Sequence, residues 1–120
     1  MKKILIVDDE PNIVMSLEYT FKKNNFEVFI ARDGLEALDI LKTNFPDVII
    51  LDVMMPMVDG FATLEQIRKD DNLQHTKVMF LSAKNKESDF EKGLALGADA
   101  YMTKPFSIKK VVEKVEELLL

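Results

Sequence analysis

The sequence predicts an α/β domain built around a parallel β-sheet, and three observations point to this class. Short apolar runs alternate with longer segments of helical periodicity, which is the pattern of consecutive βαβ units. The central runs are almost unbroken Ile, Leu, Val, Met and Phe, as expected of strands covered by helices on both faces. With 120 residues the chain has the size of one domain and needs neither disulfide nor metal to fold.

The apolar runs predict five strands. The expected strands are Ile4–Val7, Val28–Ala31, Val48–Leu51, Val78–Leu81 and Ala100–Met102. The first, third and fourth are nearly all apolar and are expected at the centre of the sheet. The second and fifth are less apolar and are expected at its edges.

Helices are expected between the strands and after the last one. The apolar positions at helical spacing are Ile13, Val14, Leu17 and Phe21; Ala37, Leu38 and Leu41; Phe61, Leu64 and Ile67; and Ile108, Val111, Val112, Val115, Leu118 and Leu119. Pro11 suits the first turn of a helix, and Asp33-Gly34 and Asp59-Gly60 mark turns before the second and third helices. Gly97 suits a left-handed helix stop before the fifth strand.

Composition narrows the functional class. A formal net charge of −5 argues against a surface that binds nucleic acid by itself, because such a surface needs clustered Lys and Arg. The chain has no cysteine and no apolar run long enough to cross a membrane. The apolar stretch that follows Met1-Lys2-Lys3 is too short for a signal peptide. A soluble, cytoplasmic protein is therefore expected. Residues 1–120 are expected to form one domain, and the missing stop signal after the last helix weakly favours a domain cut from a longer protein.

Polar side chains follow the expected strands at their carboxyl ends. Asp8-Asp9 follows the first strand, Asp52 the third, Ser82 the fourth and Lys104 the fifth. In a parallel sheet these ends share one edge, where ligands bind at the point of strand-order reversal. Taken singly, each has an ordinary explanation as a helix cap, a turn residue or a strand end. Crowded carboxylates raise one another's pKa unless a cation lies among them, so the set together predicts a divalent metal.

Four motifs carry a resemblance that spans essentially the whole chain. They are ILIVDDE, VIILDVMMPMVDG, MFLSAK and ADAYMTKPF. Together they resemble the receiver domain of a two-component response regulator. This resemblance implies a flavodoxin-like (βα)5 three-layer sandwich with a parallel sheet of order 2-1-3-4-5. It also implies a cis peptide bond between Lys104 and Pro105.

The resemblance implies a role for each acid. Asp52 is expected to accept a phosphoryl group, since a carboxylate can act as a nucleophile. Mg2+ is expected as the metal because it prefers oxygen ligands and bridges to phosphate. Asp9 is expected to bind the metal directly and Asp8 through water, and the other expected metal-site residues are Asp52 and Met54, the latter through its backbone carbonyl.

The resemblance also implies a switch. Lys104 and Ser82 are expected to bind the phosphoryl oxygens, and Tyr101 is expected to turn inward as Ser82 moves toward the phosphoryl group. Fast-decaying members of the family carry Asn and Glu at the positions of Met54 and Lys84, so this chain is expected to hold its phosphoryl group longer.

The leading hypothesis is a phosphorylatable signalling module, not an enzyme. Its expected partners are a histidine kinase or phosphotransfer protein and an output domain or downstream protein, with no nucleic acid or membrane. A metal-dependent phosphohydrolase is one alternative, although no second acid of a DxD pair accompanies Asp52. A flavodoxin-like cofactor binder lacks its phosphate loop after the first strand, where Asp8-Asp9 would repel an anion. A pseudo-receiver that binds partners without phosphorylation is the remaining alternative.

Overall fold

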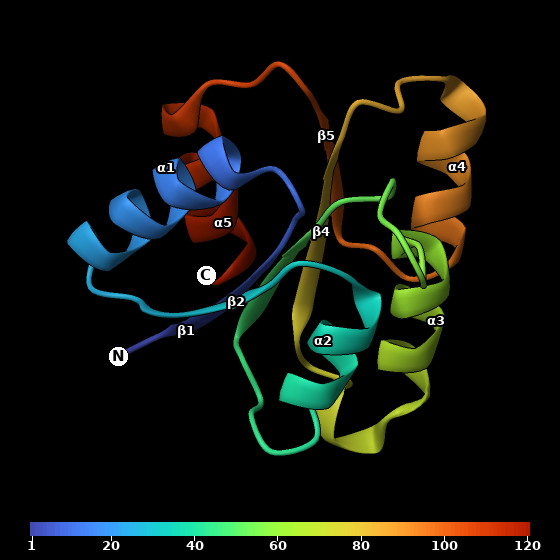
Figure 1. Cartoon of the computed structure of the whole chain (residues 1–120), viewed down its shortest axis with the longest axis horizontal. Coiled ribbons are helices and arrows are strands. Elements are labelled where there is room, and N and C mark those ends of the chain that lie inside the picture. Colours follow the sequence, from blue (N-terminus) through green and yellow to red (C-terminus); the bar gives the residue numbers. More distant parts are fainter.

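The computed structural model describes residues 1–120 as five strands alternating with five α-helices (Figure 1). The strands are β1 (Lys3–Val7), β2 (Glu27–Ala31), β3 (Val48–Leu51), β4 (Lys77–Ser82) and β5 (Ala100–Thr103). The helices are α1 (Pro11–Lys23), α2 (Gly34–Ile40), α3 (Gly60–Lys69), α4 (Glu87–Ala95) and α5 (Ile108–Leu118), with a 3-10 turn at Asp71–Leu73. All five expected strands are present, within one residue at each end.

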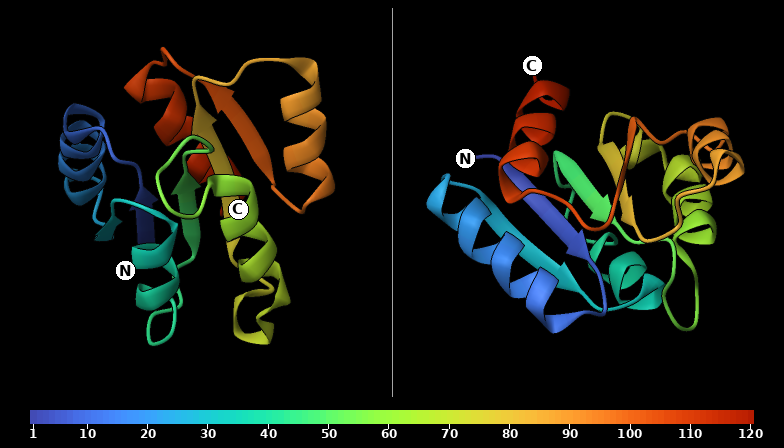
Figure 2. Two further views of the ribbon diagram at one scale, coloured as in Figure 1. Left: turned by 45° about the vertical axis from the view of Figure 1, so that its right-hand side comes forward. Right: turned by 90° about the horizontal axis from the view of Figure 1, so that it is seen from above.

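The strands form one parallel sheet in the order β2-β1-β3-β4-β5, which confirms the expected flavodoxin-like topology. Helices α1 and α5 cover one face, and α2, α3 and α4 cover the other (Figures 1 and 2). The edge strands β2 and β5 are mostly half-buried, whereas β3 is buried throughout. The division into central and edge strands is therefore as the apolar runs predicted.

Two hydrophobic cores lie on the two faces of the sheet. Alternate strand residues point to opposite faces, so Leu5 and Phe80 belong to the core under α2 and α3, whereas Ile4 and Met79 belong to the core under α1 and α5. Each core contains more than ten buried residues. The sheet is thereby held between two apolar layers, which leaves its carboxyl edge as the place where polar groups can gather.

The turn residues act as expected. Pro11 begins α1, and the side chains of Asp33 and Asp59 cap α2 and α3 by accepting from the N–H groups of Glu36 and Ala62 at 2.9 and 2.8 Å. Gly97 has a φ of 106° directly after α4. The sequence pattern indicated only the end of α4, because its periodic apolar face is weak.

The peptide bond between Lys104 and Pro105 is cis, as the family resemblance implied.

A polar network closes the amino-terminal edge of the sheet. The Arg68 guanidinium, on α3, donates from Nε to the Gly97 carbonyl at 3.0 Å and from one terminal nitrogen to the Thr76 carbonyl at 2.8 Å. The same nitrogen lies 3.3 Å from the Leu73 carbonyl, and the other pairs with Asp99 at 3.1 Å. Asp99 also accepts from the N–H of Val78, at the start of β4, so one guanidinium ties α3 to β4 and to the turn after α4.

Candidate functional site

The sheet ladder continues one residue beyond the strand ends and places the polar groups side by side. The N–H of Asp8 donates to the Ala31 carbonyl at 3.1 Å, and the N–H of Asp52 donates to the Val7 carbonyl at 3.0 Å. The N–H of Lys104 donates to the Ser82 carbonyl at 2.9 Å. Because the strands are parallel, these bonds bring residues distant in sequence to one edge. The convergence expected from the strand ends is thus present.

The ammonium of Lys104 lies at the centre of this edge. Its Nζ is 3.0 Å from a carboxylate oxygen of Asp8, 3.0 Å from one of Glu10 and 3.3 Å from one of Asp52. The side chains of Asp8, Asp52 and Lys104 are each at most 10% exposed, so these charges interact with little screening. The backbone N–H of Met54 donates to the other oxygen of Asp52 at 3.2 Å. Asp52 is therefore oriented on both of its oxygens.

The site shifts the pKa values of two of its members. Burial raises the pKa of Asp8, and the nearby charge of Asp52 raises it further, against the opposing hydrogen bonds from Glu10 N–H and Lys104. Burial alone would lower the pKa of Lys104, but the carboxylates of Asp8, Glu10 and Asp52 outweigh burial and raise that pKa well above its usual range. Lys104 therefore stays protonated, and one ammonium faces more than one negative charge.

Glu10 is a site residue that the sequence analysis missed. Its backbone N–H donates to the Asp8 carboxylate at 2.9 Å, which places its side chain beside Lys104 at the start of α1. Carboxylate oxygens of Asp8, Glu10 and Asp52 all lie within 4.8 Å of one another. Such an all-oxygen donor set with excess negative charge fits a hard divalent cation. The only local signal for Glu10 is its position directly after the acidic pair.

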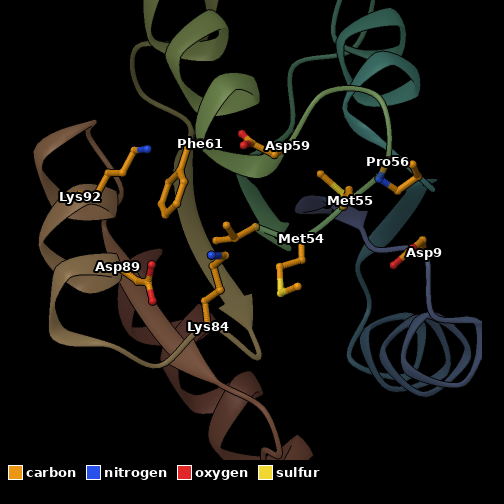
Figure 3. A pocket seen from close by; sticks show the side chains of 10 residues that line it. Asp9, Met54, Met55, Pro56, Asp59, Phe61, Lys84, Asp89 and Lys92 are labelled. Atoms are coloured by element: carbon orange, nitrogen blue, oxygen red, sulfur yellow. The ribbon is translucent and has the colours of Figure 1, made fainter.

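Asp9 and Met54 occupy a different part of the edge. Asp9 is exposed and does not join the carboxylates around Lys104. It lines a cavity of about 570 Å³, together with Met54, Phe61, Lys84 and several other residues. Figure 3 shows Asp9 on the opposite side of this cavity from α4, with Met54 and the Lys84 ammonium between them. Ligation of a metal by Asp9 and by the Met54 carbonyl stays a prediction.

Ser82 and Tyr101 lie on the neighbouring strands. Ser82 is fully buried at the end of β4, and its hydroxyl oxygen accepts from the N–H of Lys84 at 3.3 Å. The Tyr101 ring is half-buried, and its hydroxyl donates to the Lys84 carbonyl at 2.8 Å. Burial raises the pKa of that hydroxyl, and the charges of Asp89 and Asp52 add to the effect. Both residues thus hold the loop that follows β4.

Comparison with known proteins agrees with this geometry. Residues 4–116 match the family described as response regulator receiver domain. The alkaline phosphatase synthesis transcriptional regulatory protein PhoP of Bacillus subtilis is 45% identical over 118 residues, which cover 98% of this chain and 48% of that protein. The chain thus spans about half the length of this curated relative.

Two solved structures superimpose over nearly the whole chain. The receiver domain of the Francisella response regulator 1452 gives a TM-score of 0.91 at 38% identity, with 99% of this chain and 97% of that chain covered. The chemotaxis response regulator CheY4 of Vibrio cholerae gives 0.94 at 31% identity, with 99% of each chain covered.

No helix of the chain combines the length and the apolar character needed to cross a bilayer.

The family match, the fold and the acidic edge of the sheet all point to the same family. The chain belongs to the response regulator receiver domain family of two-component systems, as a phosphoacceptor signalling module whose acidic triad can hold a metal ion.

Proposed function

We propose that this domain accepts a phosphoryl group on Asp52 from a histidine kinase or phosphotransfer protein, in a Mg2+-dependent reaction. One observation carries the proposal. Asp52 is only 4% exposed, yet its carboxylate lies 3.3 Å from the Lys104 ammonium, and the next two residues, Val53 and Met54, line an open cavity. A carboxylate held beside a cation and within reach of solvent is placed to act as a nucleophile.

The transfer needs positioning and charge neutralisation more than covalent chemistry. An oxygen of Asp52 forms a bond to phosphorus as the phosphorus–nitrogen bond of a phosphohistidine donor breaks, and the imidazole leaves. Lys104 stays protonated and pairs with the phosphoryl oxygens. The hydroxyl of Ser82 donates to another phosphoryl oxygen. Ser82 ends β4, the strand beside β3, and the Lys104 ammonium reaches Asp52 from the end of β5 at 3.3 Å.

The acids of this edge fit Mg2+. We expect Asp9, Asp52 and the Met54 carbonyl to bind it directly and Asp8 to bind it through water. When bound, Mg2+ neutralises negative charge on the carboxylates and on the phosphoryl oxygens. The geometry supports this assignment because one ammonium, Lys104, faces the three carboxylates of Asp8, Glu10 and Asp52.

Phosphorylation is proposed to act through Ser82 and Tyr101. If the Ser82 hydroxyl moves to the phosphoryl group, the Lys84 N–H loses its acceptor and the loop after β4 shifts. Tyr101 bonds the carbonyl of the same Lys84, so it responds to that shift. The signal then passes to an output domain or downstream protein, and the greater length of the curated relative supports a longer regulator.

A mass measurement tests the phosphoacceptor directly. The chain is incubated with Mg2+ and acetyl phosphate, and a phosphate-sized mass increase is expected. The increase should vanish in Asp52→Asn and in excess EDTA. Asp39→Asn, which changes an exposed acid on α2, is the matched control and should be phosphorylated normally. Absence of an adduct despite Mg2+ binding would favour the pseudo-receiver, and catalytic turnover of phosphate esters would favour the phosphohydrolase.

The phosphoryl lifetime tests the residues beside Asp52. Met54 is 55% exposed and lines the cavity with Lys84, where an attacking water would approach. Neither side chain carries an oxygen that could orient this water. We expect a lifetime longer than that of chemotaxis receivers, and a shorter one in the Met54→Asn, Lys84→Glu double variant. A half-life of seconds for the unaltered chain would contradict this expectation.

A further inference from the structure

Gly93 occupies a position on α4 where two aromatic rings leave almost no room for a side chain. The residue is buried, and a Cβ atom there would lie 3.1 Å from two ring carbons of Phe80 and 3.2 Å from Cδ2 of Tyr101. Such contacts are tighter than ordinary van der Waals packing. Alanine is otherwise preferred to glycine within a helix, so the rings, not the helix, account for glycine at this position.

The two rings differ in their freedom to move. Phe80 is fully buried in the core under α3, where it packs against Phe61 with ring centres 5.4 Å apart. Tyr101 is half-buried at the edge of the sheet and packs against Phe90 with ring centres 4.7 Å apart. The hydroxyl of Tyr101 donates one hydrogen bond, to the Lys84 carbonyl. A side chain at position 93 would therefore displace Tyr101 toward solvent, because Phe80 has no space to enter.

We propose that Gly93 is a positioning residue for the switch, because the absence of its side chain leaves room for the Tyr101 ring beside Phe80, where the two ring centres lie 5.6 Å apart. This inference rests on the proposed function insofar as it takes Tyr101 to be the switch residue. A side chain forced into a filled space costs enough free energy to shift the equilibrium between two positions of the Tyr101 ring by at least about fivefold. Because coupling between two sites is reciprocal, a variant that disfavours the inward ring also weakens the response of that ring to phosphorylation.

The tyrosine content of the chain permits a direct measurement. There are two tyrosines and no tryptophan, and Tyr19 is 68% exposed on α1. In a Tyr19→Phe background, quenching of tyrosine emission by acrylamide therefore reports the exposure of Tyr101 alone. Gly93→Ala is compared with Ser88→Ala, an exposed substitution that also raises the helix propensity of α4 but lies away from the rings.

In the Tyr19→Phe background we expect Gly93→Ala to raise the quenching constant toward that of a free tyrosine amide, whereas Ser88→Ala should leave it unchanged. After phosphorylation with acetyl phosphate and Mg2+, Tyr101 should become better protected in the parent and stay accessible in Gly93→Ala. Equal quenching constants in the folded, unphosphorylated parent and Gly93→Ala would overturn the inference. Failure of the parent to gain a phosphate-sized mass would instead contradict the proposed function, whatever the quenching shows.

A double-mutant cycle covers the case in which Gly93→Ala fails to fold. The same substitution is made in the Tyr101→Ala background, where the displaced ring is absent. We expect Gly93→Ala to be tolerated there, with a coupling of at least about fivefold in the unfolding equilibrium constant. If the substitution is equally damaging in both backgrounds, the space is needed for Phe80 and the inference is wrong.

Discussion

Two largely buried cations lie at opposite edges of the same sheet, and their surroundings differ. Arg68 is surrounded by three backbone carbonyls and one carboxylate, Asp99, so its charge is balanced. Lys104 faces three carboxylates, so its edge carries a formal charge of +1 − 3 = −2. Both cations contact several oxygen atoms, but only the network around Arg68 is electrically neutral.

This difference separates a network that stabilises the fold from one that serves a ligand. A guanidinium whose charge is balanced and whose three nitrogens all donate stabilises the elements that it joins. Uncompensated negative charge on acids that are partly buried costs free energy until a cation binds, which is the arrangement expected at a functional site. Burial is the main reason that the pKa of Asp8 is raised, and the nearby charge of Asp52 adds to it. Four predictions test this contrast, from the largest expected effect to the smallest.

Arg68→Ala should be the most destabilising of these changes. It removes the donors to three carbonyls and leaves Asp99 without its cation, so we expect a loss of about 2–4 kcal/mol in the free energy of unfolding. Urea denaturation with an unchanged m-value would measure it. Arg32→Ala, which removes a mostly exposed arginine, is the matched control. A loss equal to that of the control would show that the network does not stabilise the fold.

Lys104→Met should increase the affinity for Mg2+. The ammonium already contacts the acids that would bind the metal, and one cation repels another by a few kcal/mol at about 4 Å near a protein surface. We expect Kd to fall by at least about tenfold in isothermal titration calorimetry at pH 7. Lys114→Met, which alters a lysine on α5, should leave Kd unchanged. An unchanged Kd in Lys104→Met would mean that lysine and metal do not compete.

Asp8→Asn should stabilise the metal-free protein. Because the pKa of Asp8 is raised, the folded chain holds this proton more tightly than the unfolded chain. The contribution of Asp8 to stability is therefore highest below the ordinary Asp range and falls as pH rises through the folded pKa. At pH 7 in EDTA we expect the free energy of unfolding to rise, because asparagine carries no charge that burial would penalise.

The stability difference between Asp8→Asn and the unaltered chain should shrink as pH falls, as urea denaturation at several pH values would show. Asp33→Asn is the matched control because an asparagine can still cap α2. If Asp8→Asn were destabilising at neutral pH, its pairing with Lys104 would outweigh its burial.

Glu10→Gln should have the smallest effect on stability. The Glu10 side chain is 58% exposed, so its ion pair with Lys104 is screened by water, and we expect a change within about 0.5 kcal/mol. The same substitution removes one of the three acids in the cluster and should weaken Mg2+ binding. Calorimetry on the variant would show whether Glu10 belongs to the metal site, and an unchanged Kd would assign it only to Lys104.

Most of the fold was predictable because its signals are local. The apolar run Val48–Leu51 is the whole of β3, and β4 extends the expected run only by Lys77 and Ser82. Helix α4 was the weakest element in the sequence, since its nine residues contain one fully buried position, Gly93, which adds no apolar side chain to a periodic pattern. Its place is decided by packing against β5 and not by its own periodicity.

The site was predictable in part. Asp8, Asp52 and Lys104 were expected together because parallel strand ends must meet, and they do. Glu10 was missed because its partner Lys104 lies 94 residues away in the sequence. Asp9 lies apart from the carboxylates around Lys104 because of the path of the loop between β1 and α1. The periodic pattern of the sequence does not predict the path of a loop.

The sequence by itself determined the alternation of strands and helices, the central and edge strands, and the polar residue at each strand end. These follow from periodicity and burial, which depend on near neighbours in the chain. Only the tertiary structure decided which acids share Lys104, that Arg68 joins three elements, and that two rings fill the space beside Gly93. These features depend on distances of a few ångströms between segments far apart in the sequence, and only the packed chain sets such distances.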